Sequence, residues 1–322
     1  MSAELTAARY GKTKVRVFRI VRDGKWHNIV EYNVEALLEG EIATSYTEAD
    51  NSVVVATDSI KNITYFLAKT SPHILSAEKF ALHLGTFFVS KYAHISKAFV
   101  TIEQLRWSRI HVDGEESAEG HSHSFYRDGN DKRVVKVEVD GSAGKDKLVG
   151  KVTAGINDLL VLKSTGSAFE NFYRDEYATL IEVNDRIFST SVDLSYTFAP
   201  ISLRAPTDEK KVEFVVPLQK GEEGYAGSVW DEEVPARARK ATLETFAVDE
   251  SASVQATLYK MAQRIVAENA SVNSVSYALP NKHYIPVDLR YLNIDNLTPA
   301  KAEVFMPVDA PSGLITATVT RK

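Results

Sequence analysis

Three side chains spread along the chain could together hold a flat, nitrogen-rich ring. Phe169 offers an aromatic face, Arg186 a planar fork of N–H donors, and Gln255 an amide that both donates and accepts. A lysine could not replace the fork, because an ammonium is a point charge. Each residue alone has an ordinary explanation. A phenylalanine is usually core, a glutamine near a helix start is usually solvated, and an arginine close to Asp185 and Glu182 usually forms a surface ion pair.

A second group of candidates lies nearer the N-terminus. Thr57 and Asp58 end the run SVVVAT-D, which predicts a strand giving way to a helix near Ser59. Backbone N–H groups at a helix start can receive an anion or a developing oxyanion. The plainer interpretation, favoured by sequence alone, is that one of these three residues caps the helix. Lys12 follows Gly11 just before the first expected strand and would ordinarily be an exposed lysine.

Histidines supply the remaining candidates. His283 lies two residues after Asn281, so both side chains face the same way if a strand continues through Pro280, although proline usually marks an edge or bulge. His121 and His123 form a pair of the kind that binds transition metals, but no third ligand stands at a convincing spacing, which favours a structural role. The chain has no cysteine, which excludes disulfides, thiolate nucleophiles and cysteine-based metal sites.

Five segments that contain these residues resemble the urate oxidase family. The most specific is DLLVLKSTGSAFENFYRDEY at 158–177. The other four agree in order and spacing: Tyr10-Gly11-Lys12, Val55-Ala56-Thr57-Asp58, Ser253-Val254-Gln255-Ala256-Thr257 and Leu279-Pro280-Asn281-Lys282-His283-Tyr284. The resemblance covers nearly the whole chain. It implies cofactor-free oxidation of urate by O2 and water to 5-hydroxyisourate and hydrogen peroxide, with no metal.

The resemblance also implies a role for each residue. Catalysis would rest on a proton relay of Lys12, Thr57 and His283. Oxygen would be held near Asn281 and Thr57. Urate would be contacted by Thr57, Asp58, Phe169, Arg186, Val254, Gln255 and Asn281. The family is homotetrameric with active sites at subunit interfaces, which would put Lys12, Thr57 and His283 on one subunit and Phe169, Arg186 and Gln255 on its neighbour. Asn171 stands where the family has a small residue, and Ser191 where it has an acid.

Two alternatives remain open at this point. The chain could be another purine- or pterin-handling enzyme of the same fold, because a fold does not fix a chemistry. It could also be a urate-binding protein without turnover. Loss of Lys12, Thr57 or His283 would mark the second alternative, and all three are present.

The elements that must position these residues follow from hydrophobic periodicity. Alternation predicts antiparallel strands around Val15/Val17, Val30/Tyr32/Val34, Val135/Val137/Val139, Val275/Tyr277/Leu279 and Ile315/Ala317/Val319. Helical spacing predicts helices over 76–92, with Ser76 as N-cap and Phe80, Leu84, Phe87 and Phe88 on one face, and over about 254–268, with Leu258, Met261, Ala262 and Ile265.

The order of two strands, helices and more strands occurs twice, with a hinge at 140–151. We therefore expect an α+β tandem tunnelling fold (T-fold), with antiparallel sheets that carry helices on one face and close into a barrel on oligomerisation. Its domains would be 1–145 and 146–322. The Pro/Gly- and charge-rich stretch 200–235 is expected to be an irregular excursion without a catalytic role.

Composition limits the size of the core, the partners and the location that can be expected of the protein. A chain of 322 residues with 44% hydrophobic content can bury two domain cores. A net charge of −5 argues against a nucleic-acid partner. No apolar run approaches the ~18 residues of a membrane span, and no signal peptide precedes the first strand. The resemblance implies a peroxisomal location, although this sequence stops at Arg321-Lys322 without the Ser-Lys-Leu tail of fungal members. Either the tail was removed or the protein is cytoplasmic.

Overall fold

The structure is a computed structural model of the chain that describes residues 3–113, 119–204 and 231–322. The excursion expected over 200–235 lies largely outside the described residues. Only its two ends are described, as a short strand and the start of a helix.

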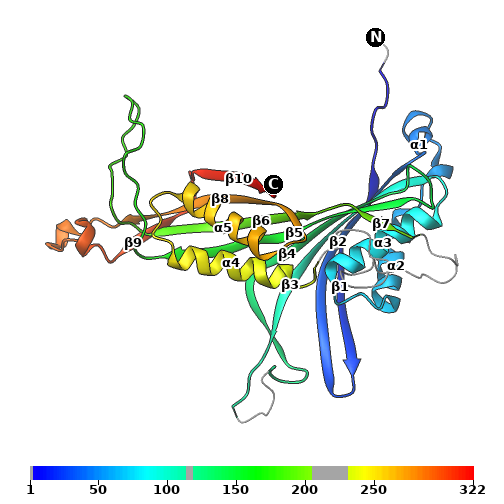
Figure 1. Cartoon of the computed structure of the whole chain (residues 1–322), viewed down its shortest axis with the longest axis horizontal. Coiled ribbons are helices and arrows are strands. Elements are labelled where there is room, and N and C mark those ends of the chain that lie inside the picture. Colours follow the sequence, from blue (N-terminus) through cyan, green and yellow to red (C-terminus); the bar gives the residue numbers. More distant parts are fainter. Residues whose placement is uncertain (1–2, 114–118, 205–230) are drawn as a thin grey trace. The chain divides into compact units, whose positions relative to one another are not determined.

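The chain builds the same order of elements twice (Figure 1). The first series is β1 (Tyr10–Asp23), β2 (Trp26–Gly40), α1 (Ala43–Thr47), η1 (Asn51–Val53), α2 (Thr57–Thr70), α3 (Ala77–Lys91), β3 (Ile95–Arg109) and β4 (Phe125–Asp140). The second is β5 (Leu148–Lys163), β6 (Phe188–Phe198), β7 (Ile201–Leu203), α4 (Val234–Val248), α5 (Val254–Glu268), β8 (Val272–Pro286), η2 (Arg290–Leu292), η3 (Pro299–Lys301), β9 (Phe305–Val308) and β10 (Leu314–Thr320). Two long strands, helices and further strands thus follow one another in both series, as the alternation predicted.

These elements form two compact units. Residues 1–155 with 197–232 make the first, and 156–196 with 233–322 make the second. The hydrogen-bonded strand order is β1-β2-β3-β4-β5-β6-β8-β10, and the unit boundaries at 155/156 and 196/197 fall inside β5 and β6. The pairs β1–β2, β2–β3, β3–β4 and β8–β10 are antiparallel. The expected hinge is the turn at 141–147 between β4 and β5, and the domain limits 1–145 and 146–322 stay a prediction.

Helix α3 supplies much of the core of the first unit. Ser76 is its N-cap, and the Ser76 hydroxyl accepts the Lys79 N–H at 3.5 Å, as the sequence predicted. Phe80, Leu84 and Phe88 are fully buried against the sheet. Each such side chain contributes roughly 1.5–3 kcal/mol on leaving water. This packing fixes the sheet on which the first functional residues stand.

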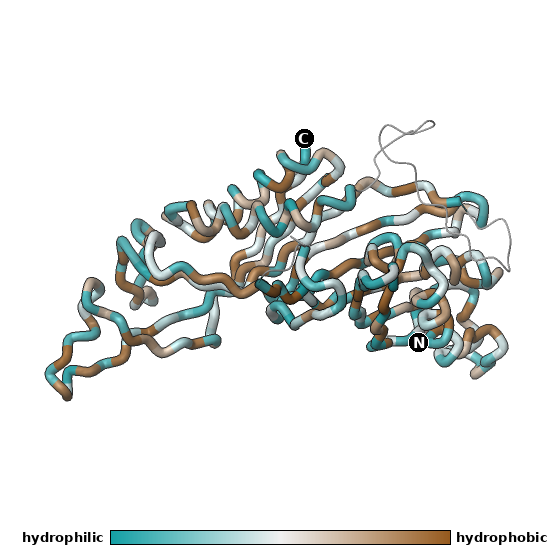
Figure 2. Tube along the Cα trace, turned by 90° about the horizontal axis from the view of Figure 1, so that it is seen from below, coloured by the Kyte–Doolittle hydropathy of each residue, from teal (hydrophilic) through white to brown (hydrophobic). Residues whose placement is uncertain are grey.

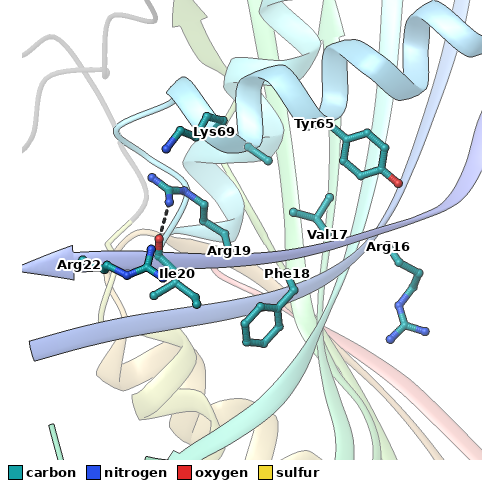
Figure 3. A pocket seen from close by; sticks show the side chains of 9 residues that line it. Arg16, Val17, Phe18, Arg19, Ile20, Arg22, Tyr65 and Lys69 are labelled. Atoms are coloured by element: carbon teal, nitrogen blue, oxygen red, sulfur yellow. Dashed lines mark hydrogen bonds between the residues drawn. The ribbon is translucent and has the colours of Figure 1, made fainter. Parts of the chain in front are cut away.

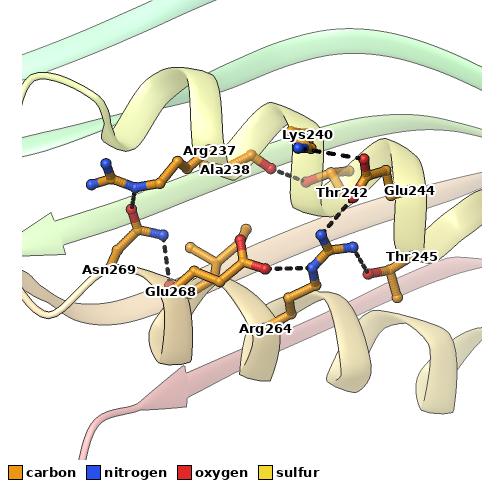
Figure 4. A network of polar contacts seen from close by, with 10 residues as sticks. Arg237, Ala238, Lys240, Thr242, Glu244, Thr245, Arg264, Glu268 and Asn269 are labelled. Carbon is orange, nitrogen blue, oxygen red and sulfur yellow. Dashed lines mark hydrogen bonds and ion pairs between the residues drawn. The ribbon is translucent and has the colours of Figure 1, made fainter.

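Helix α5 is held in the second unit by its neighbours α4 and β8. Arg264 of α5 pairs with Glu244 of α4 at 2.5 Å and with Glu268 of its own helix at 2.7 Å (Figure 4). Thr242 of α4 bonds the buried Tyr277 hydroxyl of β8 at 2.7 Å. The apolar face predicted for α5 is buried, and Figure 2 shows hydrophobic and hydrophilic residues interleaved along the helices. Contacts with its neighbours α4 and β8 therefore hold α5 in place.

One expectation about a strand was wrong. The run SVVVAT is not a strand: it comprises the end of η1 and an extended segment, and α2 begins at Thr57 rather than near Ser59. Asp50 caps η1 by accepting the Ser52 N–H at 2.9 Å, which turns the chain before a strand can pair. Strand β10 is present where the alternation predicted it, with Ile315 and Val319 half-buried and Ala317 exposed in the single chain.

Candidate functional site

The predicted site residues fall into two sets, one on each compact unit. Lys12, Thr57 and Asp58 belong to the first unit. The second unit carries the rest, which are Phe169, Arg186, Val254, Gln255, Asn281 and His283. His283 lies two residues from Asn281 in β8, in the second unit, and a single chain does not test its expected grouping with Lys12 and Thr57 on one subunit.

A β-bulge decides which way Lys12 faces. Lys12 lies opposite Ala36 and Val15 lies opposite Val34, so β1 has one residue more than β2 over this interval. The extra residue is accommodated with Lys14 at a φ of 56°. Directly paired residues share a face of the sheet. Ala36 and Val34 are both buried, so Lys12 stands on the face of Val15 and Val17, against which α2 packs (Figure 3).

The start of α2 is fixed from β1 and has no side-chain cap. The Tyr10 hydroxyl accepts the Val55 N–H at 2.7 Å, which ties the chain before α2 to the beginning of β1. Ala56 is the N-cap and provides no capping hydrogen bond. The capping role that sequence alone favoured for Thr57, Asp58 or Ser59 is therefore not observed. The first-turn N–H groups have no intrahelical acceptor and can meet an incoming anion.

Asp58 connects this helix start to Lys12 electrostatically. Its carboxylate accepts from Lys61 Nζ at 2.6 Å and from Asn62 Nδ2 at 2.9 Å. The Lys61 hydrogen bond and charge lower the pKa of Asp58, and the nearby charge of Lys12 lowers it further. The side chain of Asp58 is thus occupied, and only its backbone N–H can serve a ligand.

In the second unit, Arg186 lies over the ring of Phe169. The guanidinium carbon is 5.0 Å from the ring centroid, within cation–π range. Phe169 is half-buried rather than core, and burial lowers the pKa of Arg186. A flat face and a partly desolvated fork of donors therefore stand side by side.

The two acids near Arg186 in sequence are engaged elsewhere. Glu182 accepts the Asn171 N–H at 3.2 Å, and Asp185 accepts from the turn at 165–167. Within the described residues, Arg186 forms no ion pair. The surface ion pair that would ordinarily be expected is thus replaced by a fork that is open to a ligand.

Val254 and Gln255 form the first turn of α5. The N-cap hydroxyl of Ser253 accepts the Ala256 N–H at 3.1 Å, while the two preceding N–H groups lie in the part of a helix that lacks intrahelical acceptors. Gln255 is exposed, so its amide can turn toward a ligand. The residue before this turn is tied to the Phe169 segment, because Ala168 N–H donates to the Ser251 carbonyl at 2.8 Å.

Asn281 and His283 stand on one face of β8. The strand continues through Pro280, which removes the doubt that this proline raised, and residues two apart share a face. Thr190 of β6 donates its hydroxyl to the Pro280 carbonyl at 2.9 Å. Asn281 N–H bonds the Gly313 carbonyl at 2.8 Å, and His283 is paired with Val308 of β9. The partner of β8 therefore changes from β10 to β9 beside these two residues.

His121 and His123 pack against each other with ring centroids 4.5 Å apart, and His27 lies 5.8 Å from His123. The His123 N–H donates to Nδ1 of His121 at 3.3 Å, which occupies one of the nitrogens that could bind a metal. No group of three or more potential ligands in the described part of the chain could hold a metal ion.

A cavity of about 490 Å³ lies where β1 meets α2, away from the predicted residues (Figure 3). Its lining is cationic and aromatic and includes Arg19, Arg22, Lys69, Phe18 and Tyr65. None of the predicted site residues lines it. The predicted residues stay the candidate site, because they include a stacking face and donors at helix starts.

Sequence reasoning missed Phe172. Its ring stacks on Phe169 with centroids 4.9 Å apart and an interplanar angle of 11°. Asn171 makes this possible at a φ of 56°, a left-handed conformation that asparagine tolerates well. An asparagine between two phenylalanines was therefore the available signal, and it explains the departure noted at this position.

Comparisons with known proteins agree over the length of the chain. The family model for uricase matches residues 8–138 and 152–316. Uricase of Emericella nidulans is 46% identical over 320 residues, covering 99% of this chain and 97% of the relative. Uricase of Aspergillus flavus is 46% identical over 323 residues, covering 100% of this chain and 98% of the relative.

The fold agrees as well. The crystal structure of uricase from Arthrobacter globiformis matches with a TM-score of 0.80 at 31% identity, covering 100% of this chain and 96% of that chain. Urate oxidase from Bacillus sp. TB-90 has a TM-score of 0.75 at 22% identity and supports the fold alone. These matches confirm the predicted fold class, while its closure into a barrel on oligomerisation stays a prediction. The chain belongs to the uricase family.

Proposed function

We propose that this protein oxidises urate with O2 and water to 5-hydroxyisourate and hydrogen peroxide, without a cofactor. Family membership supports the reaction, and the Phe169–Arg186 pair is the observation that carries it. Urate is a flat anion, so it can stack on Phe169 while the guanidinium donates two parallel N–H groups to a ring carbonyl and the adjacent nitrogen. Gln255 then reads the opposite edge with its amide.

Proton removal prepares urate for oxygen. Lys12, Thr57 and His283 form the proposed relay that takes a proton from bound urate and leaves an electron-rich dianion. Ground-state O2 is a triplet and reacts poorly with closed-shell molecules. One-electron transfer from the dianion to O2 held near Asn281 and Thr57 gives a radical pair that can combine at C5. The C5 hydroperoxide then loses hydrogen peroxide, and water adds to give 5-hydroxyisourate, which balances one urate, one O2 and one water.

The two sets of residues motivate a shared site. We infer that Lys12, Thr57 and the Asp58 N–H of one subunit meet Phe169, Arg186, Gln255, Asn281 and His283 of a neighbour in a homotetramer. This grouping moves His283 to the side of the clamp, in line with its place in β8. Thr57 and Gln255 are exposed in the single chain, whereas oriented donors act most strongly when water is excluded. The strand edges at β1 and β10 are open to a second copy, which would close the sheets into a barrel.

The proposed setting is the peroxisome. The resemblance to fungal urate oxidases supports it, and so does the release of peroxide, which favours confinement. No helix in the described ranges is long and apolar enough to cross a membrane. Co-localisation of the full chain with a peroxisomal marker in a fungal host tests this, and a diffuse cytoplasmic signal would contradict it.

The decisive experiment measures loss of urate absorbance together with peroxide release by purified protein dialysed against a chelator. We expect one peroxide per urate consumed. Urate that binds but is not consumed would indicate a binding protein, and turnover of another purine or a pterin instead of urate would indicate a different enzyme of this fold.

A further inference from the structure

The residues of the proposed clamp stand on three irregular segments. Phe169 follows the turn at 165–167, Arg186 precedes β6, and Gln255 lies in the first turn of α5. Because none of the three stands inside a long strand, their relative positions must be fixed by hydrogen bonds between the segments.

Backbone bonds make the first connections. Arg186 N–H donates to the Ser167 carbonyl at 2.8 Å, and Ser251 N–H donates to the Gly166 carbonyl at 3.0 Å. The turn at 165–167 thus touches both the Arg186 segment and the segment that leads into α5. It is the junction of the three.

One carboxylate holds this junction. Asp185 Oδ2 accepts the Thr165 hydroxyl at 2.6 Å, and Oδ1 accepts the Gly166 N–H at 2.8 Å and the Ser167 N–H at 3.5 Å. Gly166 has a φ of +77°, a left-handed conformation that strains other residues. Hydrogen bonding from Thr165 lowers the pKa of Asp185, so the acceptor is ionised at neutral pH.

The same bonds keep the Asp185 charge away from Arg186. The two residues are adjacent in sequence, yet the carboxylate bonds the 165–167 turn while the guanidinium lies over Phe169. An Asp185 released from the turn would be free to pair with Arg186 and to compete with an anionic ligand.

We propose that Asp185 is a positioning residue: it fixes the turn at 165–167, aligns Phe169 with Arg186, and leaves the Arg186 fork open for urate. This role rests on the proposed function. It does not follow from charge alone, because deleting a negative charge beside an anion site should tighten urate binding, whereas loss of positioning should weaken it.

The test is anaerobic urate binding by calorimetry on the assembled full-length enzyme, since urate cannot be oxidised without O2. Asp185→Ala removes the acceptor of all three hydrogen bonds, and we expect the Kd for urate to rise about tenfold or more. Asp193→Ala is the matched control. Asp193 accepts the Asp158 N–H at 3.0 Å in the same unit, so its loss removes an equal charge and a similar bond elsewhere. We expect its Kd to stay within about twofold of wild type.

Thr165 provides a second, milder probe of the same bond. Thr165→Val removes the hydroxyl donor and should raise the Kd, while Thr165→Ser retains the donor and should bind as wild type. This pair keeps the test decisive if Asp185→Ala fails to assemble.

The outcomes distinguish failure of the proposed function from failure of the positioning role of Asp185. If wild-type protein neither binds nor consumes urate, the proposed function fails. If wild type binds urate and Asp185→Ala or Thr165→Val binds it equally well or more tightly, Asp185 has no positioning role and the proposed function stands. Under air, the variants should show a raised KM with a smaller change in kcat, because the clamp holds substrate and transition state alike. An equal loss of kcat in Asp185→Ala and Asp193→Ala, with KM unchanged, would overturn the inference.

Discussion

Replacing Arg186 with lysine tests the centre of the proposed site. The guanidinium lies 5.0 Å above the Phe169 ring, is partly buried, and has no ion-pair partner in the described residues. Both prongs are therefore available to urate. Lysine keeps the charge but not the fork or the flat surface that rests on the ring.

The size of the effect follows from these contacts. A lost hydrogen bond to a charged group costs about 1.5–3 kcal/mol, and a weakened cation–π contact about 0.5–1 kcal/mol. The sum of roughly 2–4 kcal/mol corresponds to a fall in kcat/KM of roughly thirtyfold to a thousandfold.

The assay is initial-rate urate consumption at a series of concentrations, together with thermal unfolding. Arg186→Lys should unfold within about 1 kcal/mol of wild type, because Arg186 forms no ion pair in the described residues and loses only part of its contact with the Phe169 ring. Arg290→Lys is the matched control, since Arg290 binds Asp288 on the exposed surface and belongs to neither set of site residues. A kcat/KM for Arg186→Lys within about threefold of the control would refute the assignment of the clamp.

Four further predictions concern assembly, cofactors and stability. Lys12→Ala and Arg186→Ala should each be inactive, and co-refolded hybrids of the two should regain part of the activity, because one shared site then carries neither change; verified hybrids as inactive as their parents would exclude a shared site. Activity should survive dialysis against a chelator, and restoration by a single metal after a loss would contradict this. Glu78→Ala should lower the free energy of unfolding by about 3 kcal/mol in urea titrations, since it leaves the Arg133 guanidinium, now paired at 2.5 Å, without its buried carboxylate. Because the folded pKa of Asp185 is depressed, its contribution to stability is present above the unfolded pKa of about 3.9 and is lost as pH falls through the folded pKa. The difference in unfolding free energy between wild type and Asp185→Ala should therefore stay level from about pH 7 to 5 and shrink below about pH 4. A difference that grows on acidification would contradict this prediction.

Local patterns predicted the fold well where side chains face one core. Leu258 and Ile265 mark the buried face of α5, because helical periodicity reports burial directly, whereas α3 is buried on nearly all sides, including its polar residues Glu78 and His83. The strand predicted for the run SVVVAT was wrong because it rested on local residue preference alone. Its β-branched residues suit a strand, but a strand also needs a neighbour to pair with, and no local pattern supplies one.

The candidate site residues were named from the resemblance, because taken alone Phe169 and Arg186 each have an ordinary structural explanation. Their roles in urate binding stay a prediction. That Asp185 would serve the 165–167 turn rather than its neighbour Arg186 depends on contacts twenty residues apart in sequence. The place of His283 depended on β8 continuing through Pro280, which a rule against proline in strands argues against.

The bulge in β1 determines which face of the sheet the residues before it occupy. Lys12 reaches the α2 side of the sheet only because one residue too many lies between it and Val15. If β1 paired evenly with β2 through 13 and 14, Lys12 would lie opposite Leu37 instead of Ala36. Every residue before the bulge would then change sides, and Lys12 would leave the face of Val15 and Val17. In this part of the chain, the backbone conformation at 13–14 decides which face of the sheet Lys12 occupies.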